Sequence, residues 1–310
     1  MFIFDLPPTP SCHASTIVET ADGQFAAAWF GGKAEGAKDV QIWLSRFDGK
    51  EWSKPIVVGD EAGQPCWNPV LFRTAKGTTY LWYKIGPSPQ TWTGMVRTSA
   101  DNAKTWSRPE MLPAGFYGPV RGKPIQLADG TILAGTSLES HRCWSPYVDR
   151  STDDGKTWTR SNDFGVRGKF KQIQPVLFPV GDKGEVAALA RSGDPRLIVM
   201  ASSKDAGKTF TPAVATELPN PNSGIDVVRT KEGALFLIYN PSALLRTPLS
   251  LARSTDDGKT WKKVLDLETE IGEFSYPAII QSSKGTLEMT YTWHRKHIKH
   301  VSVDPAKYRE

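Results

Sequence analysis

The sequence has few cysteines, no long apolar run and no strong excess of one charge. Its three cysteines in 310 residues, Cys12, Cys66 and Cys143, are an odd and widely spaced set. They give neither a disulfide framework nor the ligand spacing of a zinc site, so we expect free, buried thiols. No stretch of 18 apolar residues occurs, which argues against a membrane-spanning helix.

The net charge is only +5, and no run of five Lys or Arg residues is present. This balance gives little support to nucleic-acid binding, but it suits a small anionic ligand. The opening MFIFDLPPTP lacks the basic region and apolar stretch of a signal peptide. We therefore expect a cytoplasmic protein or the mature form of a secreted one, and the sequence leaves the oligomeric state open.

One eight-residue phrase recurs along the chain. STDDGKTW occupies 151–158 and again 254–261, and looser copies are SADNAKTW at 99–106 and SKDAGKTF at 203–210. A more divergent copy, SRFDGKEW, covers 45–52. The first serines of the five copies are 54, 52, 52 and 51 residues apart. A constant period of this length indicates a repeat architecture.

A second periodic feature is a glycine turn between two β-rich runs, which is typical of a β-hairpin. It occurs six times, at Gly23, Gly77, Gly130, Gly184, Gly233 and Gly285. Each unit of about 50 residues predicts four antiparallel strands, and six such units predict a six-bladed β-propeller. The last unit has only three strands of its own. We expect the N-terminal FIFDL to supply its fourth strand and close the ring, so that residues 1–310 form one all-β domain.

The repeated phrase itself has a structural logic. Its aspartate can accept hydrogen bonds from turn amides, and its glycine permits a positive φ. In the copy at 99–106, Ala103 replaces this glycine, so the backbone there must tolerate the strain. We interpret these boxes as structural and expect them on the rim, away from the chemistry.

The repeat period also predicts which residues meet at one mouth of the central channel. Polar or charged residues recur at the start of the first strand of each unit and at the end of the second. Their six basic side chains are suited to bind a planar carboxylate, as in sialic or uronic acid, and Trp67 can stack on a sugar face. The predicted substrate-binding residues are Lys84, Arg121, Lys123, Arg191, Arg246, Arg295, Trp67, Asn68, Gln174, Asn222 and Asp226.

The boxes resemble the Asp-boxes, or BNR repeats, of the sialidase superfamily. The phrases SCHAST, CWNPVLF, QPVLF, NPNSGIDVV and EFSYPAIIQ are similar to those of sialidase-like BNR-repeat proteins described as exo-sialidases. The resemblance implies a tyrosine nucleophile at Tyr276 and carboxylate-binding arginines at Arg191 and Arg246. It also implies an acid/base residue at Glu35.

Three positions depart from the pattern of that family, and one is Glu35, which stands where the family has an aspartate as acid/base. His13 stands where the first arginine of the family's triad belongs, and Gln174 stands where the glutamate partner of the tyrosine belongs. A glutamine cannot accept the tyrosine's proton as a glutamate can. Glu139 or Glu273 is a candidate substitute.

The sequence leaves three functions open. The first is a sialidase-like glycosidase in which a desolvated Glu35 protonates the leaving oxygen and Tyr276 attacks the anomeric carbon. The second is a lyase or histidine-dependent hydrolase on a uronate, with His13 or Tyr276 as the base. The third is a non-catalytic carbohydrate-binding propeller. No cofactor or metal is expected, and WHRKHIKH is interpreted as a solvated or channel-facing strand rather than a metal tract.

Overall fold

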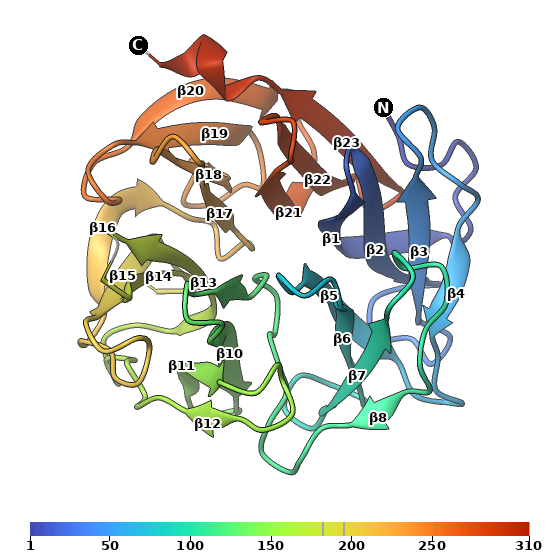
Figure 1. Cartoon of the computed structure of the whole chain (residues 1–310), viewed down its shortest axis with the longest axis horizontal. Helices are drawn as coiled ribbons and strands as arrows, with labels where there is room; N and C mark the ends of the chain where they lie inside the picture. The colour runs from blue at the N-terminus through green and yellow to red at the C-terminus, as the bar shows by residue number, and fades with distance from the viewer. Residues whose placement is uncertain (182, 195, 310) are drawn as a thin grey trace. The chain divides into compact units, whose positions relative to one another are not determined.

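A computed structural model describes residues 1–181, 183–194 and 196–309, and it is built almost wholly from β-strands (Figure 1). Six antiparallel sheets follow one another along the chain, and five of them have four strands. The fold class is the predicted six-bladed β-propeller. One short 3-10 helix, Pro305–Tyr308, follows the last strand. No helix of the described residues is long and apolar enough to cross a bilayer.

The chain divides into two compact units of three sheets each. Unit 1 comprises Met1–Gly118 together with the segment from Glu273 to the C-terminus. In it, β1 lies between β5 and β21 (Figure 1), and the Leu71 amide of β5 donates to the Thr16 hydroxyl of β1 at 3.1 Å. Its strands are β1 (Ser11–Ala21), β2 (Gln24–Gly32), β3 (Gln41–Phe47), β4 (Ile56–Gly59), β5 (Cys66–Arg73), β6 (Thr79–Ile85), β7 (Thr93–Ser99), β8 (Glu110–Met111), β21 (Phe274–Gln281), β22 (Leu287–Trp293) and β23 (His297–Val303).

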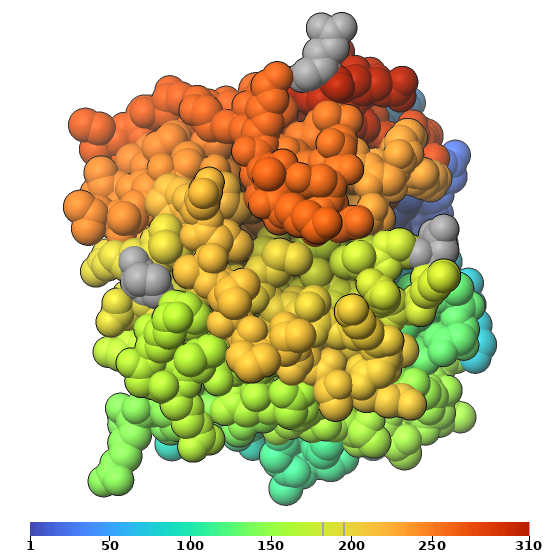
Figure 2. All heavy atoms as spheres, turned by 90° about the vertical axis from the view of Figure 1, so that its left-hand side faces the viewer, coloured from blue at the N-terminus to red at the C-terminus, as the bar shows by residue number. Residues whose placement is uncertain are grey.

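Unit 2 is the continuous segment Pro119–Gly272. Its outer strands β16 and β20 contribute to the yellow and orange surface seen in Figure 2, and Val214 of β16 is 63% exposed there. Its strands are β9 (Ile125–Gln126), β10 (Ile132–Glu139), β11 (Trp144–Ser151), β12 (Thr159–Arg160), β13 (Gln172–Val180), β14 (Glu185–Ser192), β15 (Leu197–Ser203), β16 (Val214–Pro219), β17 (Asp226–Arg229), β18 (Leu235–Tyr239), β19 (Leu249–Ser254) and β20 (Lys262–Glu268).

The six predicted glycine turns all join the first strand of a blade to its second. Each glycine has a φ between 66° and 93°, which only glycine adopts without steric cost. These turns bring consecutive strands side by side, so each blade forms from local pairing. The hairpin prediction from sequence is therefore confirmed in all six units.

The N-terminal segment lies in the last blade, as predicted. Phe2 forms a bridge with Lys299, and the Ile3 amide donates to the Ile298 carbonyl at 2.9 Å. The His300 amide in turn donates to the Met1 carbonyl at 2.9 Å. These bonds cover the edge of β23, which would otherwise present unpaired backbone groups.

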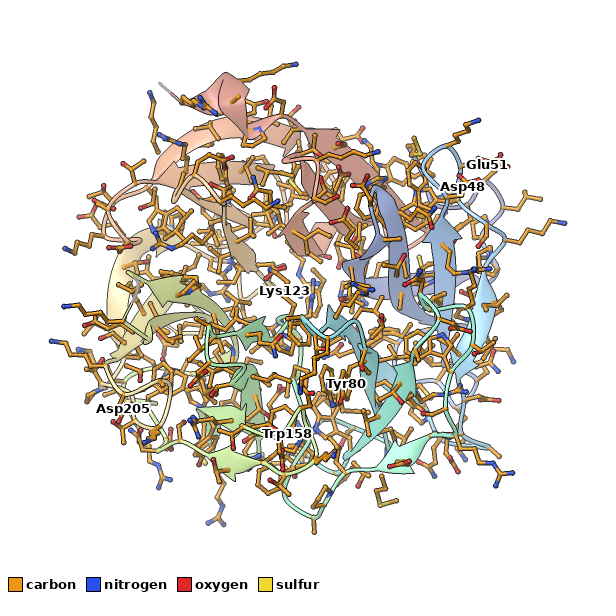
Figure 3. The ribbon with its side chains drawn as sticks, in the orientation of Figure 1. Asp48, Glu51, Tyr80, Lys123, Trp158 and Asp205 are labelled. Carbon is orange, nitrogen blue, oxygen red and sulfur yellow. The ribbon has the colours of Figure 1, made fainter. Side chains whose placement is uncertain are left out.

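Four boxes share one hydrogen-bond pattern. In the copy at 151–158, Asp153 Oδ1 accepts from the Ser151 hydroxyl at 2.8 Å and from the Thr157 amide at 2.9 Å, and Oδ2 accepts from the Thr157 hydroxyl at 2.6 Å. Figure 3 shows Asp205 and Trp158 at the outer edge of unit 2. Ala103, in the left-handed region with φ 60°, is fully buried. The divergent copy differs, because Asp48 accepts from the Lys50 and Glu51 amides.

The cysteine and histidine expectations are partly wrong. Cys12 and Cys66 are buried free thiols, and burial raises the pKa of each to about 12. Cys143 is a free thiol as well, but it is exposed because it lies between β10 and β11 rather than inside a blade. The strand at WHRKHIKH is not simply solvated, since buried His300 lies 2.8 Å from Glu288 Oε2.

The box carboxylates make folding sensitive to acid. Hydrogen bonds from the Thr157 hydroxyl and amide and from the Ser151 hydroxyl lower the pKa of Asp153 to about 2. An unfolded chain has an Asp pKa of about 3.9, so this contribution to stability is present above about pH 4 and is lost as the pH falls towards 2. Asp153→Asn should lower Tm at pH 7 and flatten the decline of Tm between pH 4 and 2. Thermal melts across this range would measure both effects.

The matched control is Asp60→Asn, at an exposed aspartate outside the boxes. It should leave both Tm and its pH dependence close to those of the unaltered chain. An Asp153→Asn variant that melts like the control at every pH would show that the box carboxylate adds no stability.

Candidate functional site

The first strands of four blades carry the same irregularity near their start. The register of each strand shifts between His13 and Thr16, Trp67 and Val70, Ile173 and Val176, or Ser275 and Ala278. Within each bulge one non-glycine residue has a positive φ: Ala14 (58°), Asn68 (37°), Gln174 (57°) and Tyr276 (50°). Each such residue costs about 1–3 kcal/mol, a strain typical of functional sites.

A proline follows the left-handed residue in three of these bulges, at Pro69, Pro175 and Pro277. Proline has no amide proton for the sheet and is therefore confined to edges and bulges. The repeated residue–Pro–apolar phrase thus marks the bulge in the sequence, a signal that strand periodicity alone does not reveal. In unit 2 the bulge also needs a glycine beside it, because a Cβ on Gly135 of β10 would lie 2.0 Å from the Pro175 carbonyl oxygen.

In unit 1 the bulges of β1 and β21 bring His13 and Tyr276 together. Their ring centroids are 4.2 Å apart with planes tilted by 47°, and Tyr276 is only 7% exposed. His13 Nδ1 lies 3.0 Å from the Thr292 hydroxyl of β22, and the Ala14 amide donates to the same hydroxyl at 3.2 Å. Thr292 was missed from the sequence, where nothing distinguishes it from Thr290 of the same strand.

Arg295, just beyond β22, joins two carboxylates. Its Nε donates to Glu273 Oε1 at 2.8 Å and its Nη1 donates to Glu35 Oε2 at 2.5 Å. Burial by itself would lower the pKa of Arg295. The hydrogen bonds and charges of Glu35 and Glu273 outweigh this effect, so the pKa is raised. The side chain of Glu35 is 40% exposed. The expectation that Glu35 is desolvated is therefore wrong, because its loop lies at the surface and pairs with an arginine.

Trp67, Asn68 and Lys84 lie on the neighbouring blade of unit 1. The Trp67 indole donates to the Gly86 carbonyl at 2.7 Å, and Lys84 Nζ donates to the Asn68 carbonyl at 3.4 Å. Trp67 and Lys84 are register partners on β5 and β6, and all three residues are buried. Backbone carbonyl groups therefore hold the side chains of Trp67 and Lys84 in place.

In unit 2, Arg191 of β14 lies against the bulge of β13. Its Nη1 donates to Gln174 Oε1 at 3.2 Å, and both side chains are buried. The amide is neutral, so this bond orients the guanidinium without cancelling its charge. A guanidinium oriented in this way suits two parallel hydrogen bonds to a carboxylate.

Lys123 has a different environment. Its ammonium donates to both carboxylate oxygens of Asp226 at 2.9 Å and to the Val227 carbonyl at 2.8 Å. An ammonium has three protons, and these bonds use all of them. Burial lowers the pKa of Lys123, and the negative charge of Asp226 offsets part of this effect. Figure 3 shows Lys123 at the inner edge of unit 2. Because all three of its protons are used in these bonds, we assign Lys123 a structural role.

The remaining predicted residues of unit 2 are more dispersed. Glu139 ends β10 and accepts from the Ser137 hydroxyl at 3.3 Å. Arg121 is buried just before β9, whereas Arg246 lies half-buried in the loop between β18 and β19, well beyond the strand end where we expected it. The amide oxygen of Asn222 is buried and has no hydrogen-bond partner among the described residues. Within residues 1–181, 183–194 and 196–309, no cluster of three potential metal ligands occurs.

Comparison with known proteins agrees with this architecture. A family model described as a BNR repeat-like domain matches residues 23–289. A sialidase of Bacteroides fragilis is 24% identical over 317 residues, a match that covers 88% of this chain but only 56% of that protein. The chain thus spans about half the length of this relative.

Two solved structures show the same fold. A protein of unknown function from Dyadobacter fermentans superposes with a TM-score of 0.79 and 18% identity, over 94% of each chain. The Hadza microbial sialidase Hz136 gives a TM-score of 0.80 and 18% identity, over 96% of this chain and 66% of that one. At these identities the likeness shows the fold alone.

The ion pair between Lys123 and Asp226 leads to a prediction about stability. Lys123→Met should destabilise the protein by about 3–5 kcal/mol, because it removes the cation that pairs with the buried carboxylate of Asp226. Adding Asp226→Asn should recover much of that loss. Denaturant unfolding of the two single variants and the double variant would measure the coupling.

Lys208→Met at an exposed box lysine is the matched control, with an expected change within about 0.5 kcal/mol. Losses from Lys123→Met and Asp226→Asn that simply add would show that the two groups do not stabilise one another.

Proposed function

Because the chain belongs to the BNR repeat-like domain family, we propose that it is a sialidase-like glycoside hydrolase acting on a carboxylated sugar. The observation that carries the proposal is the position of Tyr276. Its ring packs against the imidazole of His13, so two side chains capable of proton transfer meet at this bulge. In this role the phenolic oxygen attacks the anomeric carbon, as tyrosine does in sialidases.

Arg191 is the preferred ligand for the substrate carboxylate. A guanidinium binds a carboxylate through two parallel hydrogen bonds, and the Gln174 amide orients this one without adding a negative charge. Arg246, in a surface loop, is the second candidate. Lys123 and Arg295 already face carboxylates, so they are assigned to structural and positioning roles.

Glu35 is the assigned proton donor for the leaving oxygen. The carboxyl group is accessible and lies in unit 1, the same unit as Tyr276. Glu35 is ion-paired with Arg295, so its carboxyl group must leave that guanidinium to reach the leaving oxygen. Glu273 and Glu139 are the acidic candidates to assist the tyrosine in place of the neutral Gln174.

A second candidate function is β-elimination on a uronate. The contact of His13 with Tyr276 favours it, because two titratable rings at one point suit proton abstraction next to a neutralised carboxylate. The product would be an unsaturated uronate with a new ultraviolet absorbance. A purely binding propeller would release neither product.

Incubation with a 4-methylumbelliferyl sialoside and with a panel of uronate-containing glycans separates these functions. We expect free sialic acid, and we expect Tyr276→Phe to lower kcat more than about a hundredfold while sialic acid binding persists. Ultraviolet absorbance without fluorophore release would instead establish elimination. Binding with neither product would refute catalysis.

Tyr308→Phe, at the end of the chain's short helix, is the control for loss of a tyrosine hydroxyl. It should retain the full rate. Full activity in Tyr276→Phe would place the nucleophile elsewhere.

A further inference from the structure

The Thr292 hydroxyl makes two hydrogen bonds with residues that adjoin Tyr276. Thr292 is 0% exposed and pairs in register with Ser275, the residue before Tyr276. Its oxygen accepts the Ala14 amide proton at 3.2 Å and lies 3.0 Å from His13 Nδ1. One hydroxyl therefore links the left-handed residue of β1, the imidazole ring and the strand opposite the tyrosine.

Counting protons decides the direction of the second bond. An amide can only donate, so the bond with Ala14 uses a lone pair of the hydroxyl oxygen. The hydroxyl proton then requires an acceptor, and His13 Nδ1 is the one that the described residues offer. His13 Nε2 is buried and has no hydrogen-bond partner among the described residues. A proton on Nδ1 would therefore leave two buried groups unsatisfied, the hydroxyl proton and the Nε2 lone pair, whereas a proton on Nε2 leaves only that proton unsatisfied.

We propose that Thr292 is a positioning residue that holds His13 as a neutral imidazole with its proton on Nε2. Such a ring cannot take a proton at Nδ1 without breaking the bond from Thr292, and its Nε2 is already protonated. His13 then has no free lone pair with which to deprotonate Tyr276. Only this last consequence rests on the proposed function, and the tautomer itself does not.

The ring has little freedom to adopt another arrangement. Phe30 of β2 packs edge-on at 5.6 Å between centroids, and Tyr276 packs on it at 4.2 Å. Glu273 accepts from Arg295 Nε and from the hydroxyl of Ser275, the residue before Tyr276, each at 2.8 Å. The hydroxyl of Thr292 thus selects the tautomer while the aromatic neighbours hold the plane of the ring.

The test is to read the tautomer directly by NMR. The protein is labelled with 15N-histidine, long-range 1H–15N spectra are recorded at neutral pH, and the His13 signals are assigned by their loss in His13→Gln. We expect the Nε2–H tautomer in the unaltered chain and in Thr292→Ser, which keeps the hydroxyl. Thr292→Val, which removes it at similar volume, should show a larger share of Nδ1–H.

An Nδ1–H tautomer or an imidazolium in the unaltered protein would overturn the proposal, even if Thr292→Val does not fold. So would a Thr292→Val spectrum identical to that of the unaltered chain. These readouts need no substrate, so the proposed hydrolase activity can fail while the tautomer assignment stands, or the reverse.

Kinetics extend the test where the sialoside is turned over. Thr292→Val should lower kcat by about 10- to 100-fold with little change in KM, because the substrate contacts remain while the ring beside Tyr276 loses its position. Thr292→Ser should restore most of the rate. Equal rates in the valine and serine variants would contradict a positioning role.

Discussion

The left-handed residue near the start of a first strand is the constraint on which the candidate site depends. It interrupts the regular pairing of backbone hydrogen bonds between the strands. The side chains beside it therefore no longer alternate between the two faces of the sheet. In unit 1 the bulges at Ala14 and Tyr276 create the contact between His13 and Tyr276. In unit 2 the bulge at Gln174 places an amide on Arg191. The same left-handed backbone conformation therefore occurs with four different side chains, those of Ala14, Asn68, Gln174 and Tyr276.

Charge pairing then distinguishes cations that sequence alone treats as equal. Arg295 is held by Glu35 and Glu273, and Lys123 by Asp226, so much of their charge is cancelled. Arg191 meets a neutral amide. A count of basic residues along the repeat therefore overstates the positive charge offered to a ligand. What matters is whether the residue that orients each cation is itself charged.

The fold was predictable because its determinants are local. The glycine turns and the Ser–Asp–Thr bonds of the boxes lie within a few residues of one another, so their spacing shows in the sequence. The pairs Lys123–Asp226 and Arg295–Glu35 join residues 103 and 260 positions apart, and no periodic pattern specifies them. The hydrogen bonds of Thr292 likewise join residues from other strands. The strand ends predicted candidate residues but not their hydrogen-bond partners, and Arg246 lies in a loop beyond its predicted strand end.

Fold and chemistry are separable in this architecture. Relatives with 18% identity superpose at TM-scores of 0.79 and 0.80, so most side chains can change while the backbone persists. The boxes therefore report the fold, since their hydrogen bonds close turns at the outer edge. Function must be argued from the residues at the bulges. There, His13 and Gln174 depart from the sialidase pattern while Tyr276 keeps it, and the ring that packs against Tyr276 is an imidazole.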